Sequence, residues 1–140
     1  MAIDTATDEP IVSDIIKTIK TDQNSEGAFT WNGWAGVDMT GAAVNALKYA
    51  DQKGLEISQK IFTDAKNYLK LNQQEDGGWG WGCEEQVNVC KKSDVINTTW
   101  VLMGINSLDE GQNEAIAWLE EKGISNWKDL NFIWGGGKRL

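Results

Sequence analysis

The sequence contains no histidine, so the side chain that most often serves as a general base or as a transition-metal ligand is missing. It has one proline and two cysteines, and no apolar run reaches the length needed to cross a membrane. Thirteen basic residues stand against 21 acidic ones, which gives a net charge of −8. This balance argues against a nucleic-acid surface and against binding to anionic lipid. We therefore expect neither a nucleic-acid partner nor a membrane span.

Tryptophan and glycine are in excess, with eight and fifteen residues. A length of 140 residues suits one domain, which we expect to cover residues 1–140. Residues 1–9 are polar and acidic and lack the basic and apolar regions of a secretion signal. A signal removed upstream of this start is an open alternative, so the sequence does not fix the compartment.

A pattern of Gln, Gly and an aromatic residue occurs twice, fifty positions apart. Its members are Gln23, Gly27 and Phe29 in the first copy and Gln73, Gly77 and Trp79 in the second. A third copy is eroded, because Gly123 stands at the glutamine position. The expected repeats cover about 11–57, 58–110 and 111–134.

Each repeat reads as a helix, a glycine-rich loop and a second helix. No segment alternates apolar and polar residues, and the glycines cluster between helices rather than at two-residue hairpins. We therefore predict an all-α fold without hairpins. The expected helices cover about 10–21, 38–51, 58–72, 94–108 and 113–122, with a further turn at 127–132 and a tail at 134–140.

The helix boundaries follow from capping preferences. Pro10 is expected in the first turn of its helix, and Asp38, Ser58 and Asp94 are expected as N-caps. The first helix is expected to bury its isoleucines at i, i+4 and i+8, which are Ile11, Ile15 and Ile19.

Several segments resemble one family of helical repeat proteins. Residues 73–79 (Q-Q-E-D-G-G-W) resemble the QW motif of squalene and oxidosqualene cyclases. Residues 93–102 are similar to the S-x-x-x-Q-T-A-W-A-L stretch of those enzymes, with Asn97 at the glutamine position. Residues 37–47 resemble the D-M-T-A-M-A-x-x-A-L stretch of bacterial surface proteins that carry prenyltransferase and squalene-oxidase repeats.

The resemblance implies an α/α toroid, in which inner helices are ringed by outer ones. This chain supplies too few helix pairs to close such a ring, so we expect a partial toroid that self-associates or belongs to a larger assembly. In the family the motif aromatic stacks on the motif glutamine, which bonds the N-terminus of a neighbouring helix. The six repeat residues are therefore expected to be structural, and the surface-protein resemblance implies an extracellular or cell-surface location.

The family's chemistry is not supported by this sequence. The cyclases use a D-x-D-D motif to protonate an alkene, and no D-x-D-D occurs here. Protein prenyltransferases hold zinc with Asp, Cys and His, and histidine is absent. We therefore expect no metal and no cofactor, and the enzyme question leans toward no. The first hypothesis is a non-catalytic binding or scaffolding module; the alternative is a fragment of a terpene-cyclase-like enzyme whose acid lies outside this chain.

The two cysteines leave three states open. Cys83 and Cys90 are close enough in sequence for a loop disulfide, which the chain-entropy model values at about 2.5 kcal/mol. They are equally compatible with two free thiols. A third hypothesis rests on the similarity of residues 83–86 (C-E-E-Q) to the C-G-E-Q of complement thioester domains, in which Cys83 and Gln86 would be the linked pair.

The remaining tryptophans mark a candidate binding site. In the family, the end of the ring where the inner helices begin opens to the ligand cavity. The residues expected at that end are Trp31, Trp34, Asp38, Trp81, Asp94 and Trp100. The resemblance implies a small apolar ligand there, with a protein partner as the other candidate; the alternative is that both Asp residues are plain helix caps.

Overall fold

The computed structural model describes residues 5–80, 83–84, 89–90, 92–105 and 112–125. This part of the chain is dominated by α-helices, which confirms the predicted all-α class. They are α1 (Thr5–Thr21), α2 (Val37–Gln52), α3 (Gln59–Leu71), α4 (Val95–Ile105) and α5 (Gln112–Glu121). None of the described helices is long and apolar enough to span a bilayer.

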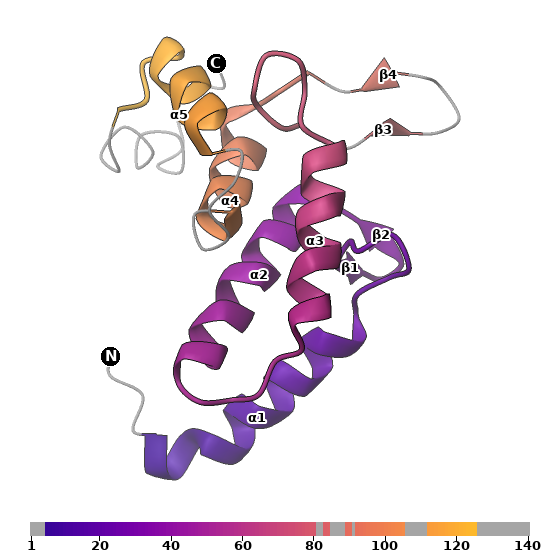
Figure 1. Ribbon diagram of the computed structural model, residues 1–140, viewed down its shortest axis with the longest axis vertical. Helices are drawn as coiled ribbons and strands as arrows, with labels where there is room; N and C mark the ends of the chain where they lie inside the picture. The colour runs from indigo at the N-terminus through magenta and orange to yellow at the C-terminus, as the bar shows by residue number, and fades with distance from the viewer. Residues whose placement is uncertain (1–4, 81–82, 85–88, 91, 106–111, 126–140) are drawn as a thin grey trace.

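The helices alternate in direction along the chain. In Figure 1, α1, α3 and α5 run one way, while α2 and α4 run the opposite way. The most extensive helix contact joins α2 to α4. These two helices approach closely because Gly41 has no side chain: a Cβ there would lie 2.3 Å from the Trp100 carbonyl oxygen. Two adjacent inner helices flanked by outer ones form the arrangement expected of an α/α toroid sector.

Two small β-hairpins precede the inner helices, so the prediction of a fold without hairpins is wrong. They consist of β1 (Thr30–Trp31) with β2 (Trp34–Ala35), and of β3 (Cys83–Glu84) with β4 (Val89–Cys90). In the first hairpin, Asn32 and Gly33 both have positive φ, at 51° and 81°. An Asn-Gly turn of this kind matches the twist of antiparallel strands, and this dipeptide was the overlooked signal.

The buried core lies between the two layers of helices. One cluster joins Tyr68 and Leu69 of α3 to Trp79, Val101 and α5. A second cluster joins α2, α3 and the partly buried isoleucines of α1. The clusters hold the ends of α2 and α4 that carry the hairpins against the outer helices.

Two expectations about the first helix are wrong. Helix α1 already begins at Thr5, so Pro10 lies inside it rather than in its first turn; the acidic residues before Pro10 favour a helix N-terminus. Ile11 and Ile15 are exposed, because the face of α1 that packs on the core carries Ile16 and Ile19 instead.

Two of the three predicted N-caps are confirmed, and one is wrong. Ser58 caps α3 as predicted, since its Oγ accepts from the Lys60 amide at 3.3 Å. Asp94 caps α4, and its Oδ1 accepts from the Asn97 amide at 2.8 Å. Asp38 is not the N-cap of α2. The helix already begins at Val37, directly after β2, and its N-cap is Gly36, which is extended and lies two residues before Asp38. The expected turn at 127–132 and tail at 134–140 lie outside the described residues.

Candidate functional site

The motif glutamine of the first repeat ties its own loop to the next outer helix. Gln23 Nε2 donates to the Gly27 carbonyl at 3.0 Å and to the Ile61 carbonyl, in the first turn of α3, at 2.9 Å. The bond to the neighbouring helix start therefore ends on a carbonyl oxygen, and not on the N–H groups that the family resemblance led us to expect. Gln73 repeats the local half of this arrangement, donating to the Gly77 carbonyl at 2.9 Å.

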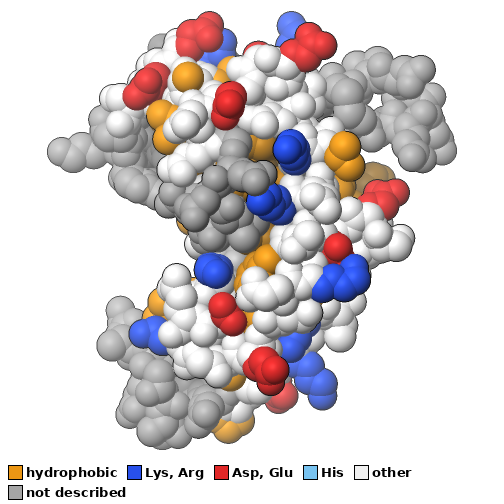
Figure 2. All heavy atoms as spheres, in the orientation of Figure 1, with side chains coloured by type: hydrophobic (Ala, Val, Ile, Leu, Met, Phe, Trp, Pro, Cys, Tyr) orange, Lys and Arg blue, Asp and Glu red, His pale blue; other side chains and the backbone are white. Residues whose placement is uncertain are grey.

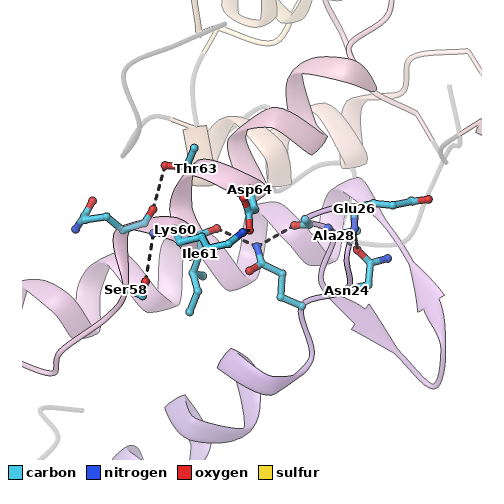
Figure 3. A network of polar contacts seen from close by, with 11 residues as sticks. Asn24, Glu26, Ala28, Ser58, Lys60, Ile61, Thr63 and Asp64 are labelled. Carbon is cyan, nitrogen blue, oxygen red and sulfur yellow. Dashed lines mark hydrogen bonds and ion pairs between the residues drawn. The ribbon is translucent and has the colours of Figure 1, made fainter.

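A side-chain oxygen braces the turn inside the first loop. Asn24 Oδ1 accepts from the backbone amides of Glu26 and Ala28, both at 3.0 Å (Figure 3). The hydrogen bond from Gln23 to the Ile61 carbonyl brings the first turn of α3 next to this loop. The first loop is thus held at its turn and at the neighbouring helix.

Each motif aromatic is anchored by a threonine of the following inner helix. The Phe29 amide donates to Thr40 Oγ1 at 3.0 Å, and the Trp79 amide donates to Thr98 Oγ1 at 2.9 Å. All four residues are buried. These threonines were missed by the sequence argument, although each stands near the start of an inner helix.

The two motif aromatics differ in one polar contact. Trp79 is 1% exposed, and its indole Nε1 donates to the Leu69 carbonyl at 2.8 Å. Phe29 is 3% exposed and has no such donor. Both rings fill the core, which agrees with a structural role for these positions.

Glycine permits the same close approach in both repeats. Gly27 and Gly77 have φ of 91° and 90°. A Cβ on Gly27 would lie 2.2 Å from the Asp64 carbonyl oxygen of α3, and one on Gly77 would lie 2.8 Å from the Glu114 carbonyl oxygen of α5. Because both glycines and both carbonyls are separated by fifty positions, α5 packs against the second loop as α3 packs against the first.

Asp76 connects the second loop to two further segments of the chain. Its Oδ1 accepts from Ser93 Oγ at 2.5 Å and from the Gly78 amide at 3.1 Å, and its Oδ2 accepts from Trp118 Nε1 at 2.9 Å. Burial acts to raise the pKa of this carboxyl, but these hydrogen bonds and the charge of Lys122 outweigh it and hold the pKa below its usual value. Asp76 thereby links the loop to α5 and to the start of α4.

Trp31 and Trp34 form an exposed pair at the end of the first hairpin. They are direct cross-strand partners in β1 and β2. Their side chains are 71% and 73% exposed, in contrast to the buried motif aromatics. The strand that carries Trp34 leads directly into α2, so the pair lies at the end of the molecule where the inner helices begin.

Two buried acceptors without partners lie at this same end. Within the described part of the chain, Asp38 Oδ1 in the first turn of α2 and Asn97 Oδ1 in the first turn of α4 are buried and accept no hydrogen bond. Asn97 Nδ2 donates to Asp94 Oδ2 at 2.7 Å, which fixes the orientation of the amide. A buried acceptor without a donor costs about 1–3 kcal/mol, so both oxygens are placed to accept from a donor that reaches this end.

Negative charge gathers around Tyr68, next to the start of α2. Burial raises the pKa of the Tyr68 hydroxyl above its usual value, and the nearby charges of Glu26 and Asp38 raise it further. On the surface shown in Figure 2, by contrast, acidic and basic side chains are interspersed rather than gathered into one patch.

The other predicted ligand residues are placed differently. Trp100 is half-buried in α4 with its carbonyl against Gly41, and Asp94 is occupied in capping α4. Trp81 and Gln86 lie outside the described residues. In the described parts of the chain, no three Cys, Asp or Glu side chains are arranged to hold a metal ion.

One cavity of about 330 Å³ lies elsewhere, between α3, α5 and the last residue of α4. None of the residues predicted to bind a ligand lines it, although two of the structural repeat residues do. Its lining consists of Lys66, Leu69, Lys70, Gln73, Trp79, Ile105 and Glu114. The cavity is therefore part of the joint between repeats rather than of the predicted site.

Paired inner and outer helices, tied by Gln-Gly-aromatic loops, define a protein of the helical-toroid class. The family model for the squalene-hopene cyclase C-terminal domain matches residues 1–137. The chain therefore belongs to this family. It is also similar to the squalene–hopene cyclase of Zymomonas mobilis subsp. mobilis, with 26% identity over 145 residues covering 94% of this chain and 21% of that protein. The chain thus spans about a fifth of the relative's length, and no solved structure matches it.

Proposed function

We propose that this chain forms one sector of a squalene-hopene-cyclase-type helical ring and supplies part of the wall of an apolar substrate cavity, while the catalytic acid lies outside the chain. The family membership and the similarity to a squalene–hopene cyclase support this hypothesis over a general scaffolding role. Because the relative is about five times longer, closing the ring needs helices from further sequence or from another chain.

The observation that carries the proposal is the apolar face of α4 around Ile96. Apart from Asn97, Thr98 and Thr99, the residues of this inner helix are apolar or glycine, as is typical of a helix that other elements surround. Val101 and Ile105 are buried, but Ile96 is 45% exposed. Met103, at i+7 from Ile96, is only half-buried and extends the same face. An apolar inner face of this kind suits a polyprenyl chain such as squalene.

The start of the inner helices is where a cavity mouth would lie. The exposed pair Trp31 and Trp34 and the partnerless acceptors of Asp38 and Asn97 support contact with a further element or ligand at this end. We propose that Trp31, Trp34, Asp38 and Trp100 contribute to the mouth of the cavity. Asp94 acts there through the orientation of Asn97.

The same end argues against acid catalysis by this chain alone. Protonation of an alkene needs a strong acid, and the cyclases supply it with D-x-D-D, which is absent from the sequence. The first turn of α2 holds one carboxylate, Asp38, and the first turn of α4 holds none. We therefore expect binding of an apolar substrate without its cyclisation.

A titration with squalene in detergent micelles, followed by tryptophan emission and compared with empty micelles, tests the proposal. Because Ile96 contributes apolar surface to the proposed wall, Ile96→Ser is expected to raise the apparent Kd about five- to tenfold. Tyr49→Ser is the matched control, since Tyr49 is 62% exposed on the distal half of α2. The combined Trp31→Ser and Trp34→Ser variant tests the mouth in the same way.

Two results would contradict the proposal. The first is an emission curve that is the same for loaded and empty micelles. The second is an equal loss of binding in Ile96→Ser and Tyr49→Ser, which would mean that the response does not come from the face of α4. Either result would favour the scaffolding hypothesis instead.

A further inference from the structure

The two hairpins occupy the same position in their repeats. Each stands between the motif aromatic and the first residues of an inner helix. Each strand has only two residues, and an isolated pair of this length is marginally stable. Both hairpins therefore need something that holds their strands in register.

The first hairpin is held at both ends. Its turn is the Asn32-Gly33 dipeptide, and its base is closed by Thr40, whose hydroxyl accepts from the Phe29 amide at 3.0 Å and donates to the Gly36 carbonyl at 2.7 Å. The second hairpin shares the closed base: the Asp94 amide donates to the Trp79 carbonyl at 2.8 Å. Its turn is different, because four residues, 85–88, separate the strands and include no Asn-Gly.

The second hairpin instead carries two cysteines directly opposite each other. Cys83 and Cys90 are backbone partners in the antiparallel pair β3–β4. Cys83 lies four residues after Trp79 and Cys90 four residues before Asp94, so the cysteine pair and the Trp79–Asp94 pair have the same antiparallel register. Directly opposed antiparallel residues have Cα atoms about 4.5–5.5 Å apart, which lies within the range that a disulfide spans.

We infer that Cys83 and Cys90 form a disulfide that closes the second hairpin, in the role that the Asn-Gly turn has in the first. The oxidant is a low-molecular-weight disulfide such as oxidised glutathione. The thiolate of one cysteine attacks it and releases one glutathione thiolate, and the second cysteine then attacks the mixed disulfide and releases the other. Two protein thiols are oxidised, and one glutathione disulfide is reduced to two thiols.

The disulfide has a defined structural consequence. Cys90 lies four residues before Asp94, which caps α4 and orients Asn97. Closing the hairpin shortens the free loop between Trp79 and Asp94 and thereby stabilises the start of the inner helix. The inference does not depend on squalene binding, because it follows from the register alone.

Alkylation of the folded protein in a glutathione redox buffer, followed by intact-mass measurement, tests the inference. The protein is expected to take up no alkyl group before reduction and two after it. Because the bridge constrains the unfolded chain, reduction is expected to lower the Tm by roughly 5–10 °C. Alkylation of both cysteines without reduction would overturn the inference, and a mass gain with methylamine would show the thioester of Cys83 and Gln86 instead.

Register variants provide the matched control. Moving both cysteines inward, with Cys83→Ser, Glu84→Cys, Val89→Cys and Cys90→Ser, preserves direct opposition. This variant is expected to form the disulfide. Moving only one, with Val89→Cys and Cys90→Ser, places the thiols on opposite faces of the hairpin and is expected to leave both free. Equal oxidation of the two variants would show that the cysteines pair through loop flexibility and not through this register.

Discussion

The first and second loops are held by the same pattern of hydrogen bonds to backbone groups, but the side chain that braces the turn differs. Both use a motif glutamine on the following glycine carbonyl and a threonine hydroxyl on the aromatic amide. The turn is braced by a neutral amide, Asn24, in the first loop and by a carboxylate, Asp76, in the second. The comparison teaches that the repeat preserves contacts at backbone groups, while the chemistry of the bracing side chain is free to vary.

The largest effect is expected at the two motif glycines. Gly27→Ala should destabilise by about 4 kcal/mol and Gly77→Ala by about 3 kcal/mol, because each Cβ would meet a helix carbonyl and φ is positive. The difference follows from the closer approach at Gly27, 2.2 Å against 2.8 Å. Urea unfolding measures both values.

Gly54→Ala is the control for the glycine comparison. Gly54 has a φ of 90°, and a Cβ there would meet nothing within 4 Å. Only the backbone strain remains, so the expected cost is about 1 kcal/mol. Equal losses in all three variants would show that φ, and not the approach of the outer helix, makes these glycines necessary.

The threonine contacts come next. Thr40→Val and Thr98→Val should each cost about 2 kcal/mol, because each leaves a buried amide of the motif aromatic without an acceptor. Thr63→Val is the control, since Thr63 Oγ1 bonds only the Gln59 carbonyl on an exposed face of α3, and it should change stability by less than about 0.5 kcal/mol. Chemical denaturation separates the two cases; a cost at Thr40 or Thr98 no larger than at Thr63 would contradict the shared anchor.

Trp79→Phe makes the second motif resemble the first. It should cost about 1 kcal/mol, because the Leu69 carbonyl loses the indole donor but keeps the Asn72 amide at 3.2 Å. Trp31→Phe, at a 71% exposed position, should be close to neutral. Thermal unfolding of both variants checks this, and a larger loss at Trp31 would mean that the first hairpin belongs to the core.

The smallest expected effect is on the pH dependence of stability, and it distinguishes the carboxylate brace Asp76 from the neutral brace Asn24. The pKa of Asp76 is lowered in the folded protein, so its contribution is present above the unfolded pKa, near 4, and is lost as the pH falls through the folded value. Because this side chain is exposed, the contribution should stay below about 1 kcal/mol. Asp76→Asn should flatten the pH dependence of the unfolding free energy between pH 5 and pH 2, as measured against wild type.

Asn24→Asp is the complementary variant. It places a carboxylate where the first loop has an amide, and both backbone amides remain available to it. It should steepen the acid loss of stability in the same pH range. No change in either variant would show that the brace charge does not contribute to folding.

The sequence predicted the helices well because they follow from periodic and local signals. The spacing of Gln23 and Gln73 located both loops, and Ser58 located a helix start. The hairpins were missed because two-residue strands carry no alternating pattern, although Asn32-Gly33 was a usable signal. Helical periodicity shows that a helix has an apolar stripe, but it does not show which side of a short stripe packs against the neighbouring helices. For this reason Ile11 was wrongly expected in the core.

The candidate site follows less directly from the sequence than the fold does. The sequence placed Trp31, Trp34 and Asp38 at the start of an inner helix, and the structure has them there. It did not reveal the role of Thr40, because a threonine hydroxyl bonds a residue eleven positions away only after the loop has folded. The missing partners of the Asp38 and Asn97 oxygens are likewise visible only once burial is known.

Recovery of squalene from the protein tests the central claim most directly. The protein is incubated with squalene micelles and separated from them by size exclusion, and the protein fraction is extracted and analysed by gas chromatography and mass spectrometry. The account predicts squalene in that fraction, chemically unchanged, because the chain supplies a cavity wall without the acid. A protein fraction without squalene, or one that contains a cyclised product, would contradict it.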